Sequence, residues 1–64
     1  MYILEFKVDK RQIHAEGLEE LKDNVKHTLE ISPELKSLEY ILLKDGKEAS
    51  AYDRTQISRT ILFG

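Results

Sequence analysis

The sequence predicts a small α+β fold, in which one amphipathic helix packs on a four- or five-stranded sheet that is antiparallel or mixed. Three observations carry this prediction. Apolar residues alternate over residues 2–8, apolar residues recur at steps of three and four over residues 18–30, and two β-rich runs flank an Asp45-Gly46 pair. The expected order is β-β-α-β-β-β in a single domain over residues 1–64.

The N-terminal segment alternates as a half-buried strand does, with Tyr2, Leu4, Phe6 and Val8 on one face. A short polar stretch follows at residues 9–11. Alternation then resumes over residues 12–16, which we expect to fold back as a second strand and to form a hairpin with the first.

The middle of the chain predicts an amphipathic helix over residues 18–30. Its apolar residues fall on one stripe, and Glu19 and Glu20 in the first turn complement the helix dipole. Pro33 cannot continue a hydrogen-bonded turn, so the helix is expected to end near Ile31.

A second hairpin is predicted around Asp45-Gly46, a pair that supplies the two positive φ angles of a type I′ turn. A two-residue loop pairs residue 42 with 49 and residue 40 with 51 on one face, and residue 43 with 48 and residue 41 with 50 on the other. The first strand is apolar on both faces, so Ile41 and Leu43 are expected on the outer face of the sheet.

The last segment, residues 53–64, fits two structures. Ile57, Arg59, Ile61 and Phe63 alternate as a strand would, whereas Asp53 with Gln56 resembles a capping box that opens a helix. We favour a strand, because it would cover an unpaired sheet edge. The expected core is Leu4, Phe6, Val8, Leu18, Leu21, Val25, Leu29, Leu38, Tyr40, Leu42 and Ile61.

The expected element order is similar to the β-grasp arrangement of ubiquitin-like domains, in which one helix crosses a mixed sheet. Modifiers and sulfur carriers of that group end in Gly-Gly. This chain carries one glycine in Leu62-Phe63-Gly64, so we do not expect carrier chemistry.

The composition favours a folded soluble domain, with 41% hydrophobic and 34% charged residues. A chain of 64 residues buries only about 60% of its unfolded surface, and the absence of cysteine excludes disulfides. Self-association, most simply a homodimer, is therefore expected. The net charge of −2 gives no general attraction to polyanions.

Neither a membrane-spanning run nor a signal-peptide layout is present, so we expect a cytoplasmic protein with no membrane contact. Lys, Glu, Ile and Leu are frequent and Trp and Cys are absent. This bias is compatible with a low-GC genome, a phage or another mobile element.

Residues for catalysis or cofactor binding are sparse. His14 and His27 lie outside any recognisable nucleophile motif and lack the short spacing of zinc ligands. The three glycines stand apart, whereas phosphate-binding loops need them clustered before a helix. We therefore expect no enzyme activity, no metal site and no cofactor.

Two functions remain open. The favoured one is a non-enzymatic protein-interaction or regulatory module that binds a partner protein, or itself, through the outer sheet face or an edge strand. The expected contact residues are Ile3, Ile41, Leu43 and Arg59. The alternative is a nucleic-acid-binding accessory protein with a local basic patch, made of Lys10, Arg11, Arg54 and Arg59.

Overall fold

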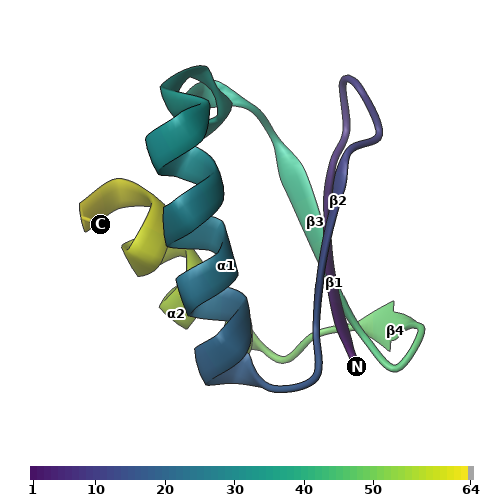
Figure 1. Cartoon of the computed structure of the whole chain (residues 1–64). Coiled ribbons are helices and arrows are strands. Elements are labelled where there is room, and N and C mark those ends of the chain that lie inside the picture. The colour runs from purple at the N-terminus through teal and green to yellow at the C-terminus, as the bar shows by residue number, and fades with distance from the viewer. Residues whose placement is uncertain (64) are drawn as a thin grey trace.

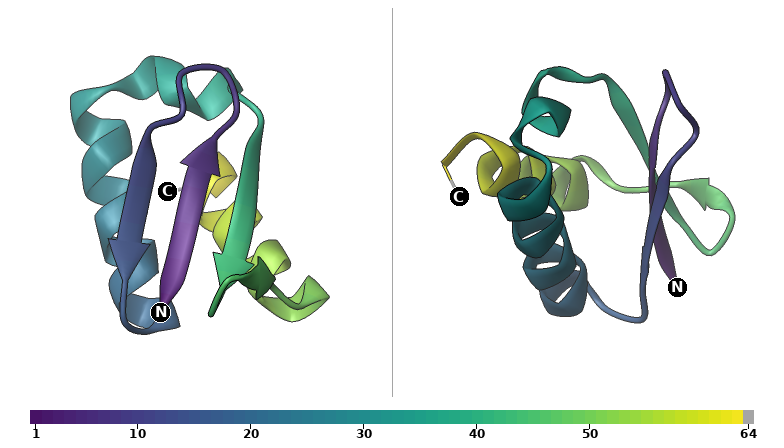
Figure 2. Two further views of the ribbon diagram at one scale, coloured as in Figure 1. Left: turned by 90° about the vertical axis from the view of Figure 1, so that its right-hand side faces the viewer. Right: turned by 45° about the horizontal axis from the view of Figure 1, so that its top comes forward.

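Two helices cover one face of a four-stranded antiparallel sheet in the computed structural model of the chain, which describes residues 1–63 (Figures 1 and 2). The elements are β1 (Tyr2–Phe6), β2 (Gln12–Ala15), α1 (Leu18–Ile31), the 3₁₀ turn η1 (Pro33–Ser37), β3 (Tyr40–Lys44), β4 (Lys47–Glu48) and α2 (Ala51–Phe63). The strand order is β2-β1-β3-β4. The predicted α+β class is confirmed.

β1 is a central strand, and its alternation is confirmed. It pairs antiparallel with β2 on one side and β3 on the other, so that Leu4 lies opposite both Ile13 and Leu42. Tyr2, Leu4 and Phe6 face the helices and are at most 7% exposed. The apolar stripe of α1 packs on this face, and α1 ends at the predicted residue, Ile31.

The core lies between the sheet and the helices, and most of it was predicted. Leu18, Leu38 and Tyr40 pack against it in part, but Val8 is 75% exposed. β1 ends at Phe6, whose C=O accepts from Lys10 N–H in the following turn, and this turn carries Val8 away from the helices. The buried core residues are Tyr2, Leu4, Phe6, Ala15, Leu21, Val25, Leu29, Leu35, Leu42, Ala49, Ile57 and Ile61.

The second hairpin has the predicted turn but a shorter second strand. Asp45 and Gly46 have φ angles of 53° and 80°, as a type I′ turn requires. Leu43 lies opposite Glu48, and Ala49 N–H donates to the Leu42 C=O at 3.0 Å. The predicted pairing of residues 40 and 41 with 51 and 50 is wrong, because β4 ends at Glu48.

The prediction of a strand over residues 53–64 is wrong for residues 53–63, which belong to α2. Its last residue, Gly64, lies outside the described residues. Ser50 begins the helix: its Oγ accepts from the Asp53 N–H at 3.2 Å, so the capping residues are Ser50 and Asp53 instead of Asp53 and Gln56. Ile57 and Ile61 are buried four residues apart, a spacing that fits both an alternating strand and a helical stripe. The element order behind the β-grasp resemblance is thus not the observed one.

A buried hydrogen bond ties α2 to the central strand. Tyr2 Oη donates to Asp53 Oδ2 at 3.0 Å. Asp53 is buried, with only 8% of its surface exposed. Lys44 Nζ lies over the Tyr2 ring, 5.4 Å from its centroid, and so adds a cation–π contact to the same tyrosine. The first turn of α2 is therefore fixed to β1 by side chains 51 positions apart.

Replacing Tyr2 with Phe should lower the free energy of unfolding by about 1–3 kcal/mol, because the buried Asp53 carboxylate loses its partner. Urea unfolding followed by circular dichroism measures this loss. Tyr52→Phe is the matched control, since Tyr52 is 67% exposed, and it should leave the midpoint unchanged. Equal midpoints for the two variants would contradict the assigned role of the hydrogen bond.

Replacing Ser50 with Ala should lower the free energy of unfolding by about 1 kcal/mol, because the Asp53 N–H loses its capping acceptor. Ser50→Asp restores an acceptor at the same position and should recover most of the loss. The same unfolding assay measures both variants. A Ser50→Ala protein as stable as the parent would show that α2 does not depend on this cap.

Candidate functional site

The outer face of the sheet presents an apolar patch formed by Ile3, Ile41 and Leu43. Ile3 lies directly opposite Leu43 across the β1–β3 pair, and Ile41 lies opposite Glu5. Figure 2, in its left-hand view, shows both helices behind the sheet, and no described element lies over this face. Ile41 is 37% exposed. Three of the four predicted contact residues are thus brought together on adjacent strands.

A polar network occupies the neighbouring part of the same face, on β1 and β2. Gln12 Nε2 donates to Glu5 Oε1 at 2.7 Å, and His14 Nε2 lies 2.8 Å from Gln12 Oε1. Each side chain fixes the next, so the polar groups are turned toward one another. The outer face is therefore divided into a polar half on β1 and β2 and an apolar half on β1 and β3.

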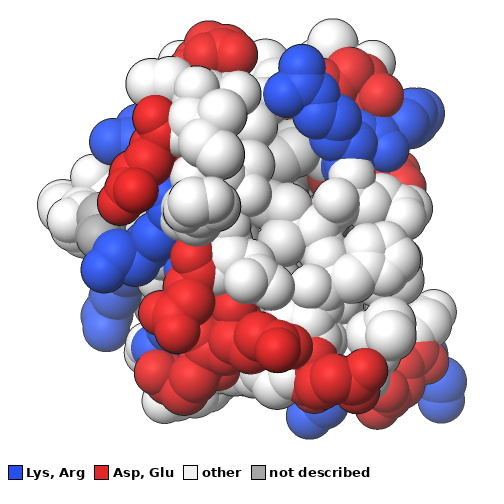
Figure 3. All heavy atoms as spheres, in the orientation of Figure 1, with Lys and Arg blue, Asp and Glu red and all other residues white. Residues whose placement is uncertain are grey.

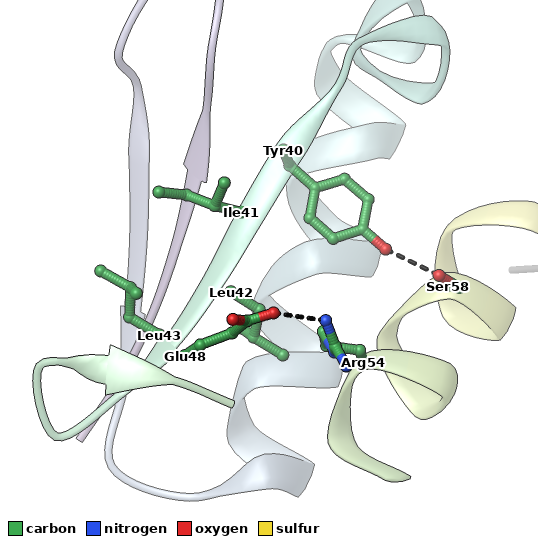
Figure 4. Close-up of a pocket in the computed structure, with 7 residues that line it drawn as sticks. All are labelled: Tyr40, Ile41, Leu42, Leu43, Glu48, Arg54 and Ser58. Atoms are coloured by element: carbon green, nitrogen blue, oxygen red, sulfur yellow. Dashed lines mark hydrogen bonds and ion pairs between the residues drawn. The ribbon is translucent and has the colours of Figure 1, made fainter. Parts of the chain in front are cut away.

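A hollow of about 500 Å³ adjoins the apolar half, on the side of β3 that faces away from β1. Figure 4 shows Ile41 and Leu43 pointing to the outer side of β3, whereas Tyr40 reaches toward α2. Tyr40 Oη and Ser58 Oγ are 2.8 Å apart and close the hollow on the helix side. The remaining lining residues are Leu42, Glu48 and Arg54, the last two joined by an ion pair.

Arg59, the fourth predicted contact residue, lies elsewhere. It was expected beside Ile57 and Ile61 on a strand, but α2 turns it to an exposed position on the helical layer. There it borders a hollow between α1 and α2 that acidic and basic side chains line together, among them Asp23 and Lys26. The structure does not bring Arg59 to the sheet face. In a strand, with a period of 2 residues, Arg59 would share a face with Ile57 and Ile61, but in a helix, with a period of 3.6, it points to another side.

The four basic residues of the nucleic-acid alternative do not form one patch. Lys10 and Arg11 belong to the β1–β2 turn, where Arg11 Nε lies 2.8 Å from Asp9 Oδ2. Arg54 and Arg59 are on α2, and Arg54 pairs with Glu48. Figure 3 shows the basic side chains of the turn separated from those on the helical side by acidic and uncharged surface.

The described residues offer no further site for a metal ion or for a membrane-spanning helix. Residues 1–63 contain no group of three or more His, Cys, Asp or Glu side chains arranged to hold a metal ion. Nor does any helix in that range combine the length and apolarity needed to cross a membrane. The amino group of Met1, 2.6 Å from Asp45 Oδ1, lowers the pKa of Asp45, but this pair lies at the β3–β4 turn, away from the hollow.

The sequence does not predict four residues of the hollow as site residues: Tyr40, Leu42, Glu48 and Ser58. It predicts Tyr40 and Leu42 in the core and Ser58 on a strand, and the contact of Tyr40 with Ser58 across 18 positions has no local signal. A helical period for residues 51–63 would have placed Arg54 and Ser58 on one side of α2, four residues apart. The capping pair Ser50 and Asp53 was the available indication of that period.

Compared with protein-family models, with curated proteins and with solved structures, the chain has no match.

Proposed function

We propose that this protein is a non-enzymatic interaction module that binds another protein through the apolar half of its outer sheet face. The observation that carries the proposal is the uncovered patch of Ile3, Ile41 and Leu43, with both helices on the opposite face. A partner that covers this patch removes apolar surface from water, and this burial stabilises the complex by roughly 25 cal/mol for each Å².

The polar network beside the patch suits the rim of an interface. Glu5, Gln12 and His14 already satisfy one another, so a partner that packs on the apolar half leaves their hydrogen bonds in place. Interfaces commonly have this division into an apolar centre and a polar rim. The patch is formed by three side chains, and so small a surface suits weak, reversible binding.

The partner proposed is a protein, and a second copy of the chain is one candidate. Two copies related by a two-fold axis would bring the same patch together from both sides, as in most homodimers. A homodimer would also supply burial that a 64-residue chain lacks alone. The cellular site proposed for this binding is the cytoplasm.

The Ile41→Lys/Leu43→Lys double variant should lose binding and keep its fold, because both side chains point outward from β3. Tagged wild-type and variant proteins are used to capture partners from a lysate of the source cell, with and without nuclease. Sedimentation velocity on the purified proteins reports self-association. We expect a protein, or a dimer, that survives nuclease treatment with the wild type and is lost with the variant.

The matched control is Ile31→Lys/Leu62→Lys. It makes the same two residue changes at positions 70% and 67% exposed on the helices, and it should bind as the wild type does. Loss of binding in both double variants would point to the added charge and contradict the proposal. Capture that disappears with nuclease would favour the nucleic-acid alternative.

A further inference from the structure

The two edges of the sheet differ in how their backbone groups are satisfied. At the β2 edge, Asn24 Nδ2 donates to the His14 C=O at 3.2 Å, and the Glu16 N–H donates to Glu20 Oε2 at 2.7 Å. Both side chains come from α1, so the helix covers the end of this edge at His14 and Glu16. A further strand could pair there only by displacing them.

On the other side of the sheet β4 pairs only with Leu43 and Lys44, so β3 has an open edge at Tyr40. Lys7 N–H donates to the Glu39 C=O at 3.0 Å. In the β1–β3 register, the backbone groups of Glu39, Ile41 and Leu43 therefore face β1 and form hydrogen bonds with it. Alternation turns the Tyr40 and Leu42 backbone groups to the opposite side. The Leu42 C=O accepts from Ala49, whereas within residues 1–63 no hydrogen bond reaches the backbone N–H or C=O of Tyr40.

The hollow described above lies beside this open edge. Its lining includes side chains from both sides of β3, with Tyr40 on the helix side and Ile41 on the outer side (Figure 4). An extended segment lying along Tyr40 would therefore have one side chain in the hollow, near Ser58, and its two neighbours on the outer face. Strands naturally alternate in this manner.

The outer-face neighbours define the chemistry of the occupant. One would lie beside Ile41, at the border of the apolar patch, and favours an aliphatic residue. The other would lie beside Glu39, whose side chain is 83% exposed. Its Oε2 atom lies 3.8 Å from Lys7 Nζ, a distance that makes this a loose ion pair. This carboxylate favours Lys or Arg. A second copy pairing antiparallel about Tyr40 would set Glu39 opposite Ile41 and would bring no cation.

We propose that the segment bound at this site is an extended strand of a partner protein, which adds to the β3 edge at Tyr40 and places a basic residue beside Glu39 and an aliphatic residue beside Ile41. This inference rests on the proposed function, because it specifies how the partner meets the sheet. The backbone of the partner pairs with the Tyr40 N–H and C=O, and its side chains give the specificity.

Amide hydrogen exchange measured by NMR on the ¹⁵N-labelled chain tests the inference. In the free protein the Tyr40 amide should exchange much faster than the Ile41 and Leu43 amides, which face β1. The probe is the capped heptapeptide acetyl-Ser-Thr-Val-Thr-Lys-Thr-Ser-amide. At a peptide concentration ten times its Kd, exchange at Tyr40 should slow roughly tenfold.

Charge reversal supplies the matched controls. The peptide with Glu in place of Lys should bind the wild type several-fold more weakly, and Glu39→Lys should reverse this preference. Glu34→Lys makes the same change at an exposed residue of η1, and it should leave the preference as in the wild type.

Three results would overturn the inference. The first is a Tyr40 amide already as slow as Ile41 in the free chain, and the second is no slowing with the peptide. The third is slowing that rises with chain concentration alone, which would identify a second copy as the occupant. If the exchange test fails while capture still depends on Ile41 and Leu43, strand addition is wrong and the proposed function stands.

Discussion

The whole structure depends on the burial of one face of β1. Tyr2, Leu4 and Phe6 point from the central strand into a core that both helices share, and β2 and β3 pair on either side of that strand. The Tyr2 hydroxyl then fixes α2 through Asp53. A chain of this size has one core, so strand order, helix placement and the position of α2 are consequences of the same alternation.

That arrangement also decides which surfaces remain open. Because both helices pack on the inner face, the outer face keeps its own side chains, and the alternation that buries Leu42 exposes Ile41. Because α1 follows β2 directly, its side chains reach the end of the β2 edge and cover it at His14 and Glu16. α2 lies farther from β3 and meets it through the Tyr40 hydroxyl, so a hollow remains beside the free backbone of that strand.

Much of the fold could be predicted from the sequence, because the signals are local. Alternation in β1, the 3–4 spacing of α1 and the positive-φ turn at Asp45 each specify one element. The last segment could not be decided by apolar spacing, since Ile57 and Ile61 fit both periods; the cap at Ser50 decides it. Ile3, Ile41 and Leu43 were foreseen by the same alternation, whereas Arg59 was misplaced with its helix and the contact of Tyr40 with Ser58 is tertiary.

Site-specific photo-crosslinking shows whether a partner contacts the outer face of the sheet. A benzophenone amino acid replaces Leu43 on the outer face or, as the reference, Leu62, which is 67% exposed on α2. Irradiation in source-cell lysate should yield a protein adduct, or a covalent dimer, from position 43 and none from position 62. Adducts from position 62 alone would place the binding surface on the helices and contradict the account.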